Sequence, residues 1–283
     1  MKFRTEIEPT ASRNLLRPET PVTLIGSCFA DNIGSRLERD GFDAVHNPLG
    51  PLYNPMSVAS CLNDALAGRR YTPSDFVIGP RGYHCLDYAT RYSGADATAI
   101  AESLNDSLEL LHSRLTSPGI LTVTFGTAYA YYLDGDTLVG NCHKFPANRF
   151  DRRRLGIEDI SAEWKKLLSR LPSELHVILT VSPVRHLADG LHGNRLSKAV
   201  LMLATEQICN ATGADYFPAY EILEDDLRDY RFYDSDLKHP SEMAAEYIYD
   251  HFMDTYMTRS GRSAALEGRR ISAAGSHRRI LTD

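Results

Sequence analysis

The sequence predicts an α/β fold in which a parallel sheet is covered by helices on both faces. Two observations lead to this prediction. First, five apolar, β-branched runs are separated mostly by segments with apolar residues at three- and four-residue spacing, and strands that alternate with helices build βαβ crossovers. Second, the runs at 120–125 and 176–181 are almost wholly apolar, as central strands buried on both faces should be.

The predicted elements follow one another along most of the chain. The predicted strands are Val22–Ile25, Asp43–His46, Ile120–Phe125, His176–Val181 and Ala214–Pro218. The predicted helices contain the apolar sets Ile33/Leu37, Val58/Leu62/Leu66, Leu104/Leu108/Leu111/Leu115, Ile160/Trp164/Leu167/Leu168, Leu201/Leu203/Ile208 and Met243/Ala244/Tyr247/Ile248. Together they predict one large domain over residues 1–258.

Three segments depart from this alternation. Residues 69–98 are polar, aromatic and glycine-rich, which predicts an inserted loop or small hairpin over one edge of the sheet. Residues 129–133 and 137–139 flank an Asp-Gly turn and predict a hairpin. From residue 259 to 283 the chain is rich in glycine, serine, alanine and arginine, and we expect a mobile or peripheral tail there.

Composition excludes several classes of protein. The 283 residues carry a formal net charge of −6, which argues against general affinity for nucleic acids. The N-terminus lacks the apolar core of a signal peptide, and no apolar run approaches the length of a membrane span. The five cysteines are scattered and never form a CxxC pair, which is typical of reduced thiols and predicts a cytoplasmic protein.

The turn at residues 26–30 is the first candidate for chemistry. Gly26-Ser27-Cys28-Phe29-Ala30 follows the first predicted strand and opens the first predicted helix. A serine there caps the helix through its side-chain oxygen, and several hydrolase folds present a nucleophilic serine in the same way. The local sequence favours the cap, so a catalytic role for Ser27 depends on a base elsewhere in the chain.

Asp236 and His239 are candidates for that base and its partner. They lie three residues apart before the last predicted helix, and Pro240 biases His239 away from helical geometry. A carboxylate at this spacing can accept the Nδ1–H of the imidazole and leave Nε2 to take a proton. The two residues suit a simple helix cap equally well, so the residues alone leave both interpretations open.

Two backbone groups are candidate donors to an oxyanion. One is the N–H of Ser27 itself, at the start of the helix, and the other is the N–H of Gly50, after the second predicted strand. Gly50 stands between Pro48 and Pro51, so a purely conformational role in a turn explains it equally well.

Polar side chains follow two further predicted elements. Asn141 and His143 come after the hairpin, and Arg185 and His186 come after the fourth strand, at the edge where open α/β sheets bind ligands. An ordinary ion pair would also explain Arg185 or His186. Cys142 and His143 lack further ligands at zinc spacing, so we expect no metal there.

The chain resembles the GSCFA domain family, whose name residues 26–30 spell. The resemblance covers nearly the whole chain apart from the tail and extends through Asn47-Pro48-Leu49-Gly50, Thr124-Phe125-Gly126-Thr127-Ala128, Asn141-Cys142-His143-Lys144, Thr180 to His186 and Asp236 to His239. That family is similar to the SGNH/GDSL hydrolases. The resemblance therefore implies a flavodoxin-like three-layer sandwich with strand order 2-1-3-4-5, and ester hydrolysis or acyl transfer.

Carried over residue by residue, the resemblance implies roles for four positions and a gap at a fifth. Ser27 matches the nucleophile, Gly50 the backbone oxyanion donor, and Asp236 and His239 the Asp-x-x-His motif. The third SGNH block usually carries Gly-x-Asn, whereas here Ala128 stands in place of the asparagine. Our hypothesis is that Asn141 or His143, brought back by the hairpin, supplies the missing donor.

The resemblance implies a cytoplasmic serine hydrolase without a cofactor. Its substrate would be a small-molecule or carbohydrate ester such as an O-acetylated sugar. One alternative is an O-acyltransferase with the same triad, which the sequence does not separate from a hydrolase. A second is a non-catalytic module that binds a glycan or another ligand, and Ala128 keeps this alternative open. Cys28 is disfavoured as a nucleophile because its side chain should point into the helix–sheet packing.

Overall fold

Five parallel strands form the central sheet of the protein, in the order β2-β1-β6-β10-β11. The computed structural model describes residues 4–8, 15–79 and 82–280. The strands are β1 (Val22–Gly26), β2 (Ala44–His46), β6 (Gly119–Phe125), β10 (Leu175–Val181) and β11 (Asp215–Phe217). In order of sequence this is the predicted 2-1-3-4-5 arrangement, so the predicted fold class is confirmed.

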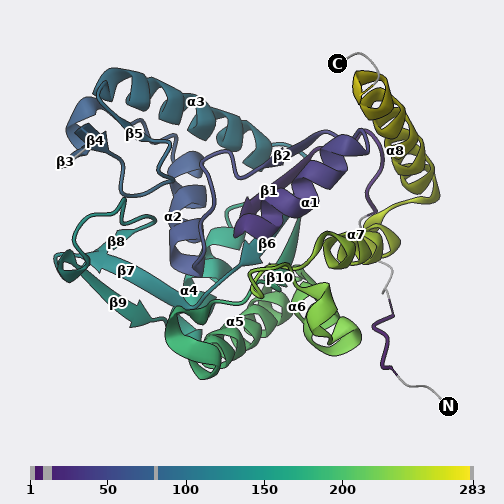
Figure 1. Cartoon of the computed structure of the whole chain (residues 1–283). Coiled ribbons are helices and arrows are strands. Elements are labelled where there is room, and N and C mark those ends of the chain that lie inside the picture. The colour runs from purple at the N-terminus through teal and green to yellow at the C-terminus, as the bar shows by residue number, and fades with distance from the viewer. Residues whose placement is uncertain (1–3, 9–14, 80–81, 281–283) are drawn as a thin grey trace.

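Helices cover both faces of this sheet and make three layers. One core contains side chains of α2 (Pro55–Leu66), α3 (Ala97–Leu115), α4 (Ile157–Leu168) and α5 (Gly190–Thr212). The other core contains side chains of α1 (Cys28–Arg39), α6 (Ala219–Glu221), the π-helix η4 (Ile222–Leu227), α7 (Glu242–Tyr256) and α8 (Arg259–Ile280). Figure 1 shows α1, α7 and α8 gathered on one side of the molecule.

Two small antiparallel sheets are added to this frame. The predicted hairpin is present as β7 (Tyr129–Leu133) and β8 (Thr137–Val139), and β9 (Phe150–Arg154) pairs with the other side of β7. The inserted region contains β3 (Val77–Gly79), β4 (Gly82–His84) and β5 (Ser93–Gly94). Short 3-10 helices lie between the other elements at η1 (Pro73–Asp75), η2 (Ala147–Arg149), η3 (Leu187–Asp189) and η5 (Tyr230–Phe232).

The tail expected to be mobile or peripheral is a docked helix over much of its length. Ala265 of α8 is completely buried in the second core. Gly268 lies so close to the chain that a Cβ there would be 2.2 Å from the backbone oxygen of Asp40. The Arg269 guanidinium donates to Asp40 Oδ2 at 2.8 Å. Small residues and an ion pair with the buried Asp40 carboxylate thus dock the helix without a large apolar stripe. Residues 281–283 lie outside the described part of the chain.

The segment before β1 is tied to the end of α7. The N–H of Leu16 donates to the carbonyl oxygen of Tyr256 at 2.5 Å, and the N–H of Thr258 donates to that of Leu16 at 3.0 Å. Leu16 is fully buried in the second core. Two segments distant in sequence are therefore held together at this point.

Candidate functional site

The serine turn connects the end of β1 to the start of α1. Gly26 has a φ of +130°, and a Cβ there would lie 2.1 Å from the carbonyl oxygen of Thr124, so the turn requires glycine. Ser27 is the N-cap of α1, with its Oγ accepting the Phe29 N–H at 3.3 Å. The N–H of Ser27 donates to the Thr124 carbonyl oxygen at 3.0 Å. The predicted cap is therefore confirmed, and the N–H expected to bind an oxyanion is used within the sheet.

Asn47 holds this turn in place, a role that sequence reasoning missed. Its Oδ1 accepts the Gly26 N–H at 2.9 Å and its Nδ2 donates to the Ser27 carbonyl oxygen at 3.3 Å. Asn47 is buried and has a φ of +39°, a backbone conformation that asparagine tolerates better than most residues. An Asn-Pro pair directly after a strand was the available signal, because asparagine often bonds to backbone groups at turns.

The Asp236–His239 pair has the predicted geometry. His239 Nδ1 lies 2.6 Å from Asp236 Oδ2, and Asp236 Oδ1 accepts the N–H groups of Lys238 and His239 at 2.9 and 3.0 Å. These two backbone bonds, followed by the imidazole, hold the pKa of the Asp236 carboxyl well below its usual range. Both side chains are partly exposed, at 47% for His239 and 41% for Asp236. The Asp236 carboxylate therefore fixes both the loop and the ring.

The loop that carries His239 lies beside the loop that follows β10. The N–H of Arg185 donates to the Lys238 carbonyl oxygen at 3.0 Å. The Arg185 guanidinium stacks at 3.8 Å on the ring of Tyr233 and lies 3.5 Å from the Glu224 carboxylate. Arg185 thus makes the kind of internal ion pair that the sequence left open as an alternative to substrate binding.

His186 faces the sheet formed by β7, β8 and β9. Its Nδ1 lies 3.4 Å from Asp189 Oδ2, and Asp189 also accepts from Arg152 Nη2 of β9 at 2.6 Å. Burial, and then the Arg152 charge, lowers the pKa of His186. With 39% of its side chain exposed, His186 remains accessible at this rim, where the Arg152 guanidinium stacks on Tyr129 at 3.9 Å.

Ser27 and His239 are not hydrogen-bonded to each other in this structure. Among the described residues, the Ser27 Oγ bonds only to the Phe29 N–H, and Nε2 of His239 has no hydrogen-bond partner. Ser27 is 1% exposed. Because all five strands are parallel, the loops of both residues leave the same edge of the sheet.

The predicted donor Gly50 is occupied in a turn. Its N–H donates to the Asn47 carbonyl oxygen at 2.8 Å, its φ is +84°, and a Cβ there would lie 2.2 Å from that of Ala89. Glycine is therefore required for the turn and for close packing of the inserted region. The expectation that this N–H is free for an oxyanion does not agree with its hydrogen bonding.

Asn141 and His143 brace the loop between β4 and β5. Asn141 Oδ1 accepts the His143 N–H at 2.8 Å, and its Nδ2 lies 3.4 Å from Thr90 Oγ1. His143 Nε2 lies 3.0 Å from the Tyr88 carbonyl oxygen, and burial lowers the pKa of its ring. A neutral ring carries one N–H, and the carbonyl contact places it on Nε2. His143 therefore has no donor left, whereas Asn141 has a second N–H to offer.

Ala128, which stands where the resemblance expects an asparagine, belongs to the core. It is fully buried, and its N–H donates to Ser197 Oγ at 2.8 Å. Its side chain lies in the first core with those of β6 and α4. The Ala128 side chain therefore belongs to the apolar packing of the core at this position.

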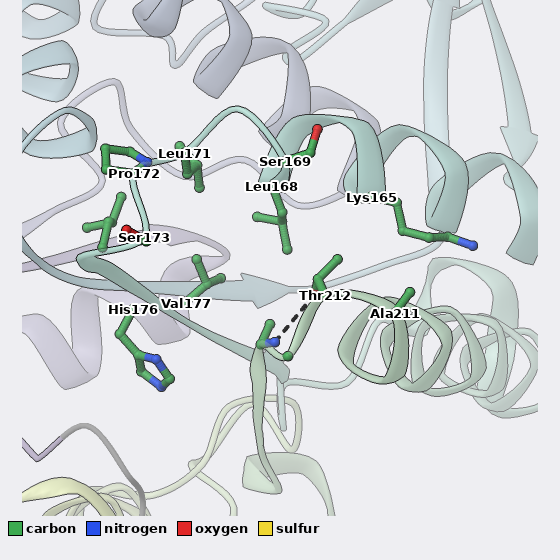
Figure 2. Close-up of a pocket in the computed structure, with 13 residues that line it drawn as sticks. Lys165, Leu168, Ser169, Leu171, Pro172, Ser173, His176, Val177, Ala211 and Thr212 are labelled. Carbon is green, nitrogen blue, oxygen red and sulfur yellow. Dashed lines mark hydrogen bonds between the residues drawn. The ribbon is translucent and has the colours of Figure 1, made fainter.

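A cavity at the opposite edge of the sheet is not part of this arrangement. Figure 2 shows it between the loops that lead into β10 and β11, with Leu168, Pro172 and Val177 among its lining residues. These loops precede their strands, whereas Ser27 follows β1. Among the described residues, no three His, Cys, Asp or Glu side chains are grouped as a metal ion would need. Within the same residues, no helix combines the length and apolar character that crossing a bilayer requires.

These features define a three-layer α/β protein that carries a capped serine at the first strand–helix turn and an Asp–His pair on a loop before α7. The family model described as the GSCFA family matches residues 21–252. The chain belongs to the GSCFA family. A search of curated proteins finds no match.

Proposed function

We propose that this protein is a serine hydrolase that cleaves an ester, with Ser27 as nucleophile, His239 as general base and Asp236 as the residue that orients the imidazole. The observation that supports this most is the 2.6 Å contact between His239 Nδ1 and Asp236 Oδ2. It leaves Nε2 of His239 available to take a proton. The parallel strand order also brings the loops of His239 and Ser27 to one edge of the sheet.

In the proposed reaction, the Ser27 hydroxyl donates its proton to a hydrogen bond with His239 Nε2. Because a hydroxyl has one donor and two acceptor lone pairs, Ser27 Oγ can still accept the Phe29 N–H at the same time. Ser27 Oγ then attacks the acyl carbonyl carbon while its proton passes to His239. The tetrahedral intermediate expels the alcohol, which takes that proton, and leaves an acyl-serine. Water deprotonated by His239 then attacks the acyl-serine and releases the acid.

The proposed oxyanion site is weaker than the resemblance implies. The backbone N–H groups of Ser27 and Gly50 and the ring Nε2–H of His143 already donate to other acceptors. The second side-chain N–H of Asn141 and the positive end of α1 are therefore the proposed sources of oxyanion stabilisation. Loss of one oxyanion donor typically costs about 2.7–4 kcal/mol. We therefore expect slow turnover.

Aromatic side chains around the proposed site favour a carbohydrate ester as the substrate class. Tyr53 is 47% exposed, and its Cβ and that of Ser27 lie 3.5 and 3.2 Å from the position that a Gly126 Cβ would take. Tyr131 is 36% exposed, and the Arg152 guanidinium lies 5.6 Å from its ring centre. Aromatic faces combined with charged and polar groups bind ligands that have an apolar ring face and a polar rim.

A serine-directed probe tests the proposed reaction. Incubation of the wild type with a fluorophosphonate should label Ser27, and p-nitrophenyl acetate and an O-acetylated sugar should release acetate. Ser27→Ala should lose both labelling and turnover while keeping its fold. His239→Ala should lower the labelling rate by at least 10²-fold. Unlabelled wild type, or full turnover by Ser27→Ala, would refute the proposal. Product analysis with and without a sugar acceptor separates hydrolysis from acyl transfer.

A non-catalytic ligand-binding module is the second candidate, and the burial of Ser27 is the observation that favours it. Ser27 is 1% exposed and its Oγ is engaged with the Phe29 N–H. On this alternative, the wild type binds an acetylated sugar in calorimetry but neither reacts with the probe nor releases acetate. Equal binding by Ser27→Ala would support it further.

A further inference from the structure

Lys198 of α5 is a buried lysine whose amine lies at the ends of two strands of the central sheet. It is 1% exposed, and its Nζ donates to the carbonyl oxygens of Gly126 and Ser182 at 2.8 and 2.6 Å. These residues follow the ends of β6 and β10 directly. One side chain thus connects the backbone at the end of one strand to that of its neighbour.

The Gly126 carbonyl connects Lys198 to the serine turn. A Cβ on Gly126 would lie 3.2 Å from Ser27 Cβ and 3.1 Å from the Tyr53 carbonyl oxygen. That carbonyl oxygen accepts the Gly126 N–H at 2.8 Å. Only the missing side chain of Gly126 leaves room for Ser27 Cβ, so a shift of the Gly126 backbone would displace the surroundings of Ser27.

The Ser182 carbonyl connects Lys198 to the histidine loop. Ser182 Oγ accepts the Val184 N–H at 3.2 Å, and the N–H of the next residue, Arg185, donates to the Lys238 carbonyl oxygen. Lys238 lies directly before His239. The position of this loop therefore depends on the backbone that Lys198 holds.

Three further groups surround the Lys198 ammonium. The Tyr220 ring lies with its centre 5.6 Å from Nζ, while the Glu224 carboxylate of η4 and the Cys28 thiol of α1 interact with it through space. Burial lowers the pKa of Lys198 to about 7, against the attraction of Glu224. A neutral amine still has two N–H groups, so it can keep both carbonyl bonds in either protonation state.

We propose that Lys198 is a positioning residue that fixes the separation between the Ser27 turn and the His239 loop by joining the carbonyl groups of Gly126 and Ser182. This inference rests on the proposed hydrolase function. Lys198 touches neither the substrate nor the reacting atoms. It acts on kcat through geometry, because small displacements of a nucleophile from its base cost large factors in rate.

The test compares Lys198→Met with Lys198→Arg, using Lys166→Met on the exposed side of α4 as the control. Each folded variant is assayed for the fluorophosphonate labelling rate of Ser27 and for kcat and KM with p-nitrophenyl acetate. We expect Lys198→Met to lower kcat and labelling by at least tenfold with KM within threefold of wild type. Lys198→Arg should recover most of the loss, and Lys166→Met should match the wild type.

Lys198→Gln decides the question if Lys198→Met does not fold. It keeps a polar, hydrogen-bonding group but shortens the side chain that now joins the Gly126 and Ser182 carbonyl oxygens, and a several-fold loss of kcat at unchanged KM is expected. Wild-type labelling in a folded Lys198→Met, or an unchanged kcat in Lys198→Gln, would overturn the inference. An unlabelled wild type instead refutes the hydrolase function, and this inference falls with it.

Discussion

The turn that presents Ser27 depends on one buried asparagine, and its removal should be measurable. Asn47→Ala leaves the Gly26 N–H, now bonded to Asn47 Oδ1 at 2.9 Å, without a partner in the interior. An unsatisfied buried donor costs about 1–3 kcal/mol. Alanine at the φ of +39° adds roughly 1–2 kcal/mol of backbone strain. We therefore expect Asn47→Ala to lower the free energy of unfolding by about 2–5 kcal/mol.

Two further variants separate the causes of that loss. Asn47→Gly removes the same hydrogen bond but tolerates positive φ, so it should be more stable than Asn47→Ala by about 1 kcal/mol after allowing for the greater freedom of glycine in the unfolded chain. Asn148→Ala changes an exposed asparagine and should stay within about 0.5 kcal/mol of wild type. Urea denaturation followed by circular dichroism measures all three.

Two results would contradict this role of Asn47. Equal losses in Asn47→Ala and Asn148→Ala would mean that the buried amide does not hold the turn. Equal stabilities of Asn47→Ala and Asn47→Gly would mean that backbone strain of alanine at residue 47 does not contribute to the loss of stability. Because roughly 2 °C of Tm corresponds to each kcal/mol in a chain of this size, thermal melts should give the same order with a decrease of about 4–10 °C for Asn47→Ala.

Other changes test the ion pairs, the packing and the buried cation. Asp236→Asn should be less stable than wild type at pH 7, and the gap should narrow as the pH falls below 3.8, the ordinary pKa of the carboxyl, because the stabilisation from a lowered folded-state pKa is complete above the ordinary pKa and is lost as the pH falls toward the lowered one. Arg269→Ala should cost about 1.5–3 kcal/mol in urea denaturation, since it removes a charged hydrogen bond to a buried carboxylate, whereas Arg270→Ala should cost under about 0.5 kcal/mol. Gly126→Ala should slow fluorophosphonate labelling about tenfold, because its methyl group crowds the nucleophile. Between pH 7 and pH 10, the free energy of unfolding of the wild type should rise relative to that of Lys198→Met, because the lowered pKa of Lys198, about 7, means that the unfolded chain binds more protons.

The central sheet could be predicted because its strands carry a strong local signal. The apolar runs around Val22 and Ile120 are too short for helices and are bounded by turns, and the structure places strands at both. β9 carried no such signal. Its sequence, Phe-Asp-Arg-Arg-Arg, reads as a loop, yet Arg152 stacks on Tyr129 and Arg153 lies 4.7 Å from the ring centre of Tyr132. This strand is defined by contacts with β7 that no local pattern displays.

In the candidate site, too, contacts that are local in sequence could be predicted and contacts between distant segments could not. The bond between Asp236 and His239 is local in sequence and was predicted from spacing. The roles of Asn47 and Lys198 depend on contacts between segments 21 and 72 residues apart. Neither residue type is unusual at its position, so only the assembled fold reveals them. For Gly50, the sequence predicts an N–H free to bind an oxyanion, whereas in the structure this N–H donates to the Asn47 carbonyl oxygen within a turn.

The bond between Leu16 and the end of α7 has a practical consequence for attachment. Leu16 precedes β1 and α7 runs back from the His239 loop, so the chain passes Leu16 and Thr258 at the edge of the sheet opposite Ser27. The segment before Leu16 leads back to η4, because Arg4 pairs with Asp226, so attachment there would not be anchored away from the serine turn. A surface linker joined to a chain shortened after α8 starts from a helix docked on the far end of α1, and immobilisation through that point should leave the Ser27 edge facing the solution.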